Sequence, residues 1–147
     1  MSPQECEFPK FNASSDEIKA ILKNAKTIAV VGISAKPDRP SHWIAQYLKD
    51  KGYRVIGVNP TYQEVFGEPV HASLLDVKEP IDIVDIFMRP EKIPPVVDLA
   101  IEKGAKVIWM QEGIVNNEAA EKARSAGLKV VMNKCIFKEH RAWESAQ

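Results

Sequence analysis

Residue types that commonly bind metal ions or form disulfides are scarce in this sequence. Its 147 residues include two cysteines, Cys6 and Cys135, and three histidines, His42, His71 and His140. These residues are scattered along the chain and show no spacing typical of metal ligands. We therefore expect no metal site. A chain of this length buries about 70% of its unfolded surface, so it can fold as one domain without such cross-links.

The sequence also lacks an excess of either charge. Its 20 Lys and Arg residues balance its 20 Asp and Glu residues. Without a basic field we expect no binding to nucleic acid, and any anion site must be built from local charges. No apolar run approaches the ~18 residues of a membrane span, and no apolar N-terminal stretch indicates secretion. We therefore expect a cytoplasmic protein without membrane contact.

Common catalytic motifs are absent as well. The chain has no P-loop, no paired-carboxylate motif and no serine, histidine and aspartate in the order of a triad. Cys135 is a weak candidate for a nucleophile, and a structural role is the more common interpretation of such a cysteine.

Five apolar runs have the length and composition of buried strands. They are Thr27–Val31, Arg54–Val58, Ile81–Phe87, Lys106–Met110 and Leu128–Met132. Helical segments lie between most of them, at Ser41–Gly52, Glu91–Gly104 and Asn117–Gly127. Pro60–Glu79 instead predicts an irregular connection with a short helical turn near Ser73. Because apolar strands that alternate with helices form covered parallel sheets, the pattern predicts an α/β fold with a mainly parallel five-stranded sheet and helices on both faces.

The N-terminal region divides into two parts. Residues 1–13 are mostly polar and predict an arm, whereas residues 14–147 form the predicted domain. Ser14 and Glu17 have the spacing of a capping box, which predicts the start of a short helix.

Polar or conformationally special residues follow every predicted strand. Open parallel sheets bind ligands outside the carboxyl ends of their strands, where the strand order reverses. The segments at that edge are Gly32–Ser41, Asn59–Tyr62, Met88–Pro90, Gln111–Gly113 and Asn133–Cys135. We expect the binding site there.

The first of these segments lies within "VVGISAKPDRPSHW", residues 30–43. A dinucleotide fingerprint would continue from Gly32 with two more glycines, but Ser34, Lys36 and Arg39 follow instead. Gly32 lets backbone N–H groups approach a phosphate, and Arg39 is able to bind one in a bidentate manner. The alternative is an ordinary loop with solvated charges.

The next strand ends favour different chemistry from a NAD site. Asn59 and Pro60 stand where a NAD site usually has an acid for the ribose, which disfavours NAD. Met88 offers apolar atoms, and Arg89 is either a second phosphate ligand or a surface ion-pair partner. Glu112 is either a base or a solvated charge.

Four stretches together resemble a known family, the stand-alone CoA-binding proteins. These are single-domain relatives of the CoA-binding N-terminal domain of succinyl-CoA synthetase α subunits. The resemblance covers roughly residues 15–141, through "TIAVVGISAKPDRPSHWIAQYLKDKGYRVIGVNP", "VFGEPVHASLLDV", "IDIVDIFMRPEKIPPVVDLAIEKGAKVIWMQEGI" and "GLKVVMNKC". It implies a Rossmann-like, doubly wound fold with coenzyme A across the carboxyl ends of the strands.

The resemblance also implies a set of site residues. The diphosphate would contact Gly32, Ile33 and Ser34, with Lys36, Arg39, Pro40 and Ser41 completing the phosphate side. The adenosine would contact Val58, Asn59 and Pro60. The middle of the ligand would contact Phe87, Met88 and Arg89, and the pantetheine arm Met110, Gln111 and Glu112. Coenzyme A carries a ribose 3′-phosphate besides its diphosphate, which suits cations in the first loop.

Two classes of function follow from these observations. The first is a non-catalytic protein that binds CoA or acyl-CoA, with a possible protein partner or homo-oligomer. The related ligases carry their phosphorylated histidine in a second domain, and this sequence ends at Gln147, so we expect no ligase activity from this chain alone. The second is a NAD(P)-linked or CoA-thioester enzyme that uses Glu112 or Cys135. Cys135 would exchange with the CoA thiol if the pantetheine reached the fifth strand.

Overall fold

A computed structural model describes residues 7–147. Within them the strands are β1 (Thr27–Val31), β2 (Arg54–Val58), β3 (Glu64–Val65), β4 (Glu68–His71), β5 (Ile83–Ile86), β6 (Val107–Met110) and β7 (Lys129–Val131). The α-helices are α1 (Ser15–Asn24), α2 (Pro40–Asp50), α3 (Ile93–Lys103), α4 (Asn117–Ser125) and α5 (Ile136–Ser145). Two short 3₁₀ helices are η2 (Leu74–Asp76) and η3 (Pro90–Lys92).

The strands form one sheet in the order β3-β4-β2-β1-β5-β6-β7. All neighbours are parallel except β3 and β4, which form an antiparallel pair. Without β3, the parallel strands have the 3-2-1-4-5-6 order of a Rossmann fold. The order reverses between β1 and β5, and open α/β sheets generally bind ligands at the carboxyl ends of the strands at such a reversal.

The prediction of a five-stranded sheet was wrong, because the sheet has seven strands. The two additional strands, β3 and β4, lie in the segment predicted to be irregular. They are short, and β4 contains Pro69 and pairs with β2 through only Val70 and His71. A strand this short at a sheet edge leaves no periodic apolar pattern. The predicted helical turn is confirmed as η2, whose cap Ser73 accepts a hydrogen bond from the Leu75 N–H.

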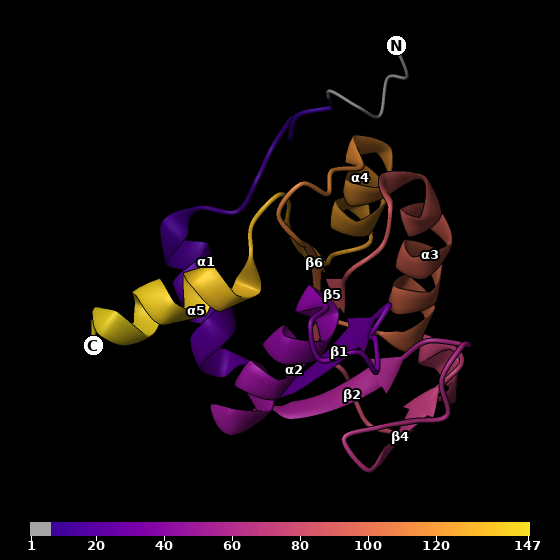
Figure 1. Ribbon diagram of the computed structural model, residues 1–147. Helices are drawn as coiled ribbons and strands as arrows, with labels where there is room; N and C mark the ends of the chain where they lie inside the picture. The colour runs from indigo at the N-terminus through magenta and orange to yellow at the C-terminus, as the bar shows by residue number, and fades with distance from the viewer. Residues whose placement is uncertain (1–6) are drawn as a thin grey trace.

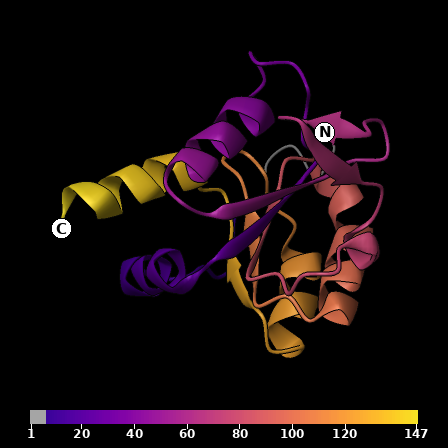
Figure 2. The same cartoon turned by 90° about the horizontal axis from the view of Figure 1, so that it is seen from below.

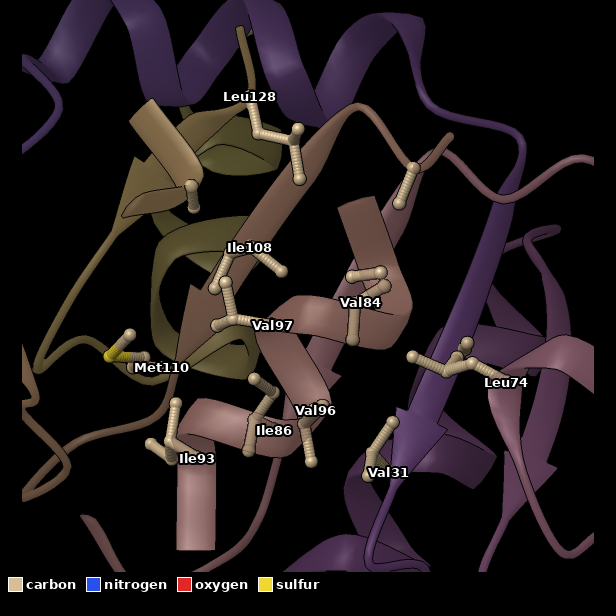
Figure 3. Packing of buried hydrophobic residues seen from close by; sticks show 14 of the residues in the cluster. Val31, Leu74, Val84, Ile86, Ile93, Val96, Val97, Ile108, Met110 and Leu128 are labelled. Carbon is tan, nitrogen blue, oxygen red and sulfur yellow. The ribbon is translucent and has the colours of Figure 1, made fainter. Parts of the chain in front are cut away.

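Helices cover both faces of the sheet, as predicted. Figure 2 shows α3 and α4 on one side of the strands and α1, α2 and α5 on the other. Successive strand residues point to opposite faces, so Val31 packs in the α3/α4 core and Val30 in the α1/α2/α5 core. Figure 3 shows the first core, in which Val97 and Ile93 of α3 lie against the sheet. These two apolar cores fix the sheet edge that carries the site.

The helix α5 was not predicted, although α1 was. The α1 capping box is present: the Glu17 N–H donates to Ser14 Oγ at 3.1 Å, and the Ser14 N–H donates to Glu17 Oε1 at 2.9 Å. Helix α5 begins after Cys135, which makes no side-chain cap. Its sequence contains many charged and aromatic residues, and only Ile136 and His140 among its described residues are buried. The helix therefore has no long apolar face that the sequence would reveal. Figure 1 shows α5 leading to the C-terminus beside α1.

The predicted arm lies only partly within the described residues. Residues 1–6, including Cys6, lie outside them, and residues 7–13 contain no helix or strand. Asn12 exchanges two hydrogen bonds with the Met132 backbone, at 2.8 and 2.9 Å, and Phe11 packs under the Arg124 guanidinium. The described part of the arm is therefore bound to the domain.

Two further features concern residues 7–147 as a whole. Within this range, no helix combines the length and apolar character that a membrane crossing requires. No group of three or more His, Cys, Asp or Glu side chains in the same range is placed to hold a metal ion.

Candidate functional site

Gly32 makes the turn that ends β1. Its φ of +90° lies in the region that glycine adopts readily, and its N–H donates to the Val58 carbonyl at 2.9 Å. A Cβ added at Gly32 would lie 2.5 Å from the Phe87 carbonyl oxygen. The first loop therefore passes close against the ends of both β2 and β5, and only glycine fits there.

Two side chains hold the next residues of this loop. Asn59 Nδ2 donates to the Ile33 carbonyl at 2.8 Å, and His42 Nδ1 donates to the Ser34 carbonyl at 2.9 Å. Asn59 Oδ1 also accepts from the Thr61 N–H at 2.8 Å. The first loop is thus tied to the end of β2 and to the first turn of α2.

A cavity of about 590 Å³ opens beside this loop, and we name it the cationic cavity. Its lining residues are Gly32, Ser34, Lys36, Arg39, Pro40, Ser41, Tyr62, Phe87, Met88, Arg89, Pro90, Gly113 and Ile114. A second cavity of about 260 Å³, which we name the apolar cavity, is lined by Val31, Gly32, Val58, Asn59, Pro60, Ala72, Ser73, Leu74, Met88, Val96 and Leu99. The two cavities share Gly32 and Met88, so they meet where the strand order reverses.

The cationic cavity is electropositive. Lys36, Arg39 and Arg89 form no ion pair with any residue in 7–147. Helix α2 begins at this cavity with no capping side chain and no acid in its first turn. The partial positive charge of that helix terminus therefore adds to the three side chains, and together they favour an anion.

The pKa of the Tyr62 hydroxyl is affected by the same positive charges. The pKa of this phenol is lowered from its ordinary value, first by hydrogen bonding from the Ser34 hydroxyl and also by the Ala35 backbone. The charges of Lys36 and Arg39 lower the pKa of Tyr62 further. An oxygen at this position is therefore stabilised in its negative form.

The structure brings most of the predicted site residues together at the two cavities. Four do not line either cavity: Ile33, Met110, Gln111 and Glu112. Ile33 and Met110 are buried, at 1% and 0% exposure. Gln111 Oε1 accepts from the Ile136 N–H at 3.2 Å, and Glu112 forms an exposed ion pair with Lys138 at 2.8 Å.

Several lining residues were not selected from the sequence. In the cationic cavity these are Tyr62, Pro90, Gly113 and Ile114. The first three lie in segments that follow predicted strands, so their position was the available signal. In the apolar cavity they are Val31, Ala72, Ser73, Leu74, Val96 and Leu99. Ala72, Ser73 and Leu74 follow β4, which the sequence did not reveal.

The two candidate catalytic residues lie outside both cavities. Glu112 is engaged by Lys138, as described above. Cys135 is a free thiol at the start of α5, with 8% of its surface exposed. Neither geometry presents a nucleophile or a base to a ligand in the cavities.

Comparisons with known proteins agree with this architecture. A family described as a CoA binding domain matches residues 26–141. The uncharacterized protein YneT of Bacillus subtilis is 44% identical over 129 residues, which are 88% of this chain and 96% of that protein. A solved structure of a hypothetical protein from Pyrococcus horikoshii is similar at a TM-score of 0.89 and 41% identity, over 95% of this chain and 99% of that chain.

A ligase shares a smaller region with this chain. The ADP-forming acetate–CoA ligase of Methanocaldococcus jannaschii is 26% identical over 119 residues, which are 76% of this chain but 17% of the ligase. The resemblance to stand-alone CoA-binding proteins is therefore confirmed, together with a relationship to part of a CoA ligase. With residues 26–141 matched, the chain belongs to the CoA-binding domain family.

Proposed function

We propose that this protein binds coenzyme A across the carboxyl ends of β1, β2 and β5, as a non-catalytic binding protein. The observation that carries the proposal is the pair of cavities that meet at Gly32 and Met88. The cations of one cavity have no ion-pair partner within residues 7–147, and the other cavity has mainly apolar walls. A ligand with phosphates at one end of a flat adenosine matches this division.

The phosphates are assigned to the cationic cavity. The diphosphate lies against the first loop, where Gly32 removes the Cβ that would obstruct the backbone. Lys36 and Arg39 bind phosphate, including the ribose 3′-phosphate, and Arg89 faces the same space from the end of β5. Arginine suits this role because its planar guanidinium group can donate two parallel hydrogen bonds to the oxygens of one phosphate.

The adenosine is assigned to the apolar cavity. Val58, Pro60 and Leu74 supply apolar walls there, and Met88 adds a flexible side chain shared with the phosphate region. Asn59 stands at the end of β2 and offers no carboxylate to a ribose diol. The same feature argues against NAD.

The pantetheine arm is assigned to the side of the cationic cavity that Gly113 and Ile114 line. This path runs past the residues that follow β6. Because Glu112 and Cys135 lie outside the cavity, we propose binding without catalysis. The matched ligase is much longer than this chain, since the matched residues make up only 17% of its length.

Calorimetric titration with CoA, dephospho-CoA and NAD tests the proposal. A charge-assisted phosphate contact contributes roughly 1.5–3 kcal/mol, so CoA should bind about tenfold or more tightly than dephospho-CoA. NAD should bind far more weakly than CoA. Arg39→Ala should weaken CoA and narrow its advantage over dephospho-CoA.

The control is Arg141→Ala, which removes an exposed arginine outside both cavities. It should leave CoA binding unchanged. Equal affinities for CoA and dephospho-CoA would remove the loop cations from the phosphate site. Tight NAD binding, or no CoA binding, would overturn the proposed function.

A further inference from the structure

Two consecutive peptide carbonyls of the first loop are held by side chains from elsewhere in the chain. Asn59 Nδ2 donates to the Ile33 carbonyl and His42 Nδ1 donates to the Ser34 carbonyl, at 2.8 and 2.9 Å. No peptide bond in residues 7–147 is cis. In a planar trans peptide the C=O and the following N–H point in opposite directions. The two side chains therefore also fix the directions of the Ser34 and Ala35 N–H groups.

These two N–H groups are not used by the fold. Within residues 7–147, neither donates to a backbone carbonyl. The Ser34 hydroxyl accepts from the Lys36 N–H at 3.1 Å, which keeps this side chain on the loop. Ser34 lines the cationic cavity together with Tyr62, so this part of the loop borders the space assigned to the phosphates.

We propose that Asn59 and His42 are positioning residues that aim the Ser34 and Ala35 amides at the diphosphate of the ligand. This inference rests on the proposed function and adds residues that make no phosphate contact of their own. Successive backbone N–H groups can form a concave anion site, and peptides that are free to rotate would lose it. Asn59 acts through the Ile33–Ser34 peptide, and His42 acts through the Ser34–Ala35 peptide.

His42 has two contacts that substitution can separate. Its Nδ1 holds the Ser34 carbonyl, and its ring packs against Phe66 with centroids 4.5 Å apart. His42→Phe keeps a ring against Phe66 but removes the donor. His42→Asn removes the ring but keeps a donor, because the Asn amide nitrogen is attached to Cγ as Nδ1 is in histidine. A positioning role and a packing role therefore predict opposite orders of damage.

The first measurement is calorimetric titration of both His42 variants and the wild type with CoA. We expect His42→Phe to weaken CoA about tenfold, as loss of one well-placed hydrogen bond to a charged group would. We expect His42→Asn to bind more tightly than His42→Phe. Thermal unfolding of each variant checks that it is folded. The reverse order of affinities in folded variants would overturn the positioning role of His42.

The second measurement follows the amide resonances of Ser34 and Ala35 by NMR, with inorganic pyrophosphate and then CoA as probes. In the wild type both amide protons should shift downfield. Asn59→Asp keeps the shape and the acceptor for the Thr61 N–H, but replaces the donor with an oxygen. It should reduce the Ser34 shift more than the Ala35 shift, whereas His42→Phe should do the opposite.

The outcomes separate this inference from the proposed function. If CoA binds and neither amide shifts, the proposed function stands and the positioning role is wrong. If CoA fails to bind but pyrophosphate shifts both amides, the amides are aimed at an anion and the proposed function is wrong. If each variant affects both amides equally, the peptide-by-peptide assignment is wrong.

Discussion

Replacing Gly32 by alanine tests the geometry on which the site depends. The residue has a φ of +90°, and an added Cβ would lie 2.5 Å from the Phe87 carbonyl oxygen. That oxygen belongs to the backbone after β5, so it cannot move without shifting the strand end. We expect Gly32→Ala to separate the first loop from β5 and to weaken both folding and CoA binding.

Gly104 provides a matched control. It has a φ of +82° at the end of α3, and an added Cβ would meet nothing within 4 Å. Both substitutions carry the cost of a left-handed conformation, roughly 1–2 kcal/mol. Only Gly32→Ala carries the cost of overpacking, typically about 1–3 kcal/mol more. The difference between the two variants isolates the contact with Phe87.

Urea denaturation of both variants measures this difference. The free energy of unfolding of Gly32→Ala should be lower than that of Gly104→Ala by roughly 1–3 kcal/mol. CoA titration should show weaker binding for Gly32→Ala and an unchanged affinity for Gly104→Ala. Equal destabilisation of the two variants, or unchanged CoA binding by Gly32→Ala, would refute the close approach of the first loop to β5.

Three further predictions concern other parts of the chain. Ser14→Ala removes the α1 capping box and should lower the free energy of unfolding by roughly 0.5–2 kcal/mol in urea denaturation, with no change in CoA affinity. In a Cys6→Ser background, Cys135 should react with a thiol reagent far more slowly in the folded protein than in urea, since only 8% of it is exposed; equal rates would contradict its burial. Asp85 is fully buried with both carboxyl oxygens unpaired within residues 7–147, and burial raises its pKa well above the ordinary value. The folded state therefore holds this proton more tightly than the unfolded chain, so the free energy of unfolding should fall as the pH rises above the unfolded pKa of aspartate. Asp85→Leu should remove this pH dependence and stabilise the protein by roughly 1–3 kcal/mol at neutral pH; an unchanged pH profile would show that Asp85 is charged or solvated.

The central strands could be predicted from the sequence because both of their faces are buried. β1 and β2 begin and end where the apolar runs do, at Thr27–Val31 and Arg54–Val58. Their neighbours begin or end one or two residues inside the predicted runs, since flanking residues such as Ile81 are apolar yet lie outside the ladder. The apolar pattern in the sequence reflects burial of the side chains, and buried residues continue past the ends of the hydrogen-bonded strands.

The β3–β4 pair could not be predicted because tertiary contacts hold it. Phe66 at its turn has a φ of +62°, which a phenylalanine rarely adopts. Its ring lies against His42 and under the Lys49 ammonium, and Lys49 pairs with Glu68. His42 and Lys49 belong to α2 (Pro40–Asp50), well before the pair in the chain, so no local pattern in the sequence shows these contacts.

Two predicted site residues at the end of β6 do not line either cavity. Met110 and Gln111 were expected beside pantetheine, but Met110 still belongs to β6 and points into the α3/α4 core. Gln111 is 5% exposed and binds the first turn of α5. Both residues follow the carboxyl-edge prediction in sequence position, but the alternation of side chains along a strand sends residues such as Met110 into a core. The loops one or two residues further on line the cavity instead.

Asn59 shows a different limit of sequence analysis. The sequence analysis selected Asn59 because it stands where a NAD site usually has an acidic residue. In the structure both ends of its side-chain amide are hydrogen-bonded: the nitrogen donates to the Ile33 carbonyl and the oxygen accepts from the Thr61 N–H. The identity of the residue could be interpreted from the sequence, but its partner 26 positions away could not.

The charge of the site depends on pairing, which composition does not show. The chain carries equal numbers of basic and acidic residues, so no field of the whole protein attracts an anion. Some cations elsewhere are paired with acids: Arg54, for example, forms ion pairs with both Glu68 and Glu79. Around the cationic cavity, Lys36 and Arg39 have no acidic partner within residues 7–147. We therefore expect the proposed anion affinity to come from these unpaired cations, and because the two side chains are exposed, rising salt should weaken it.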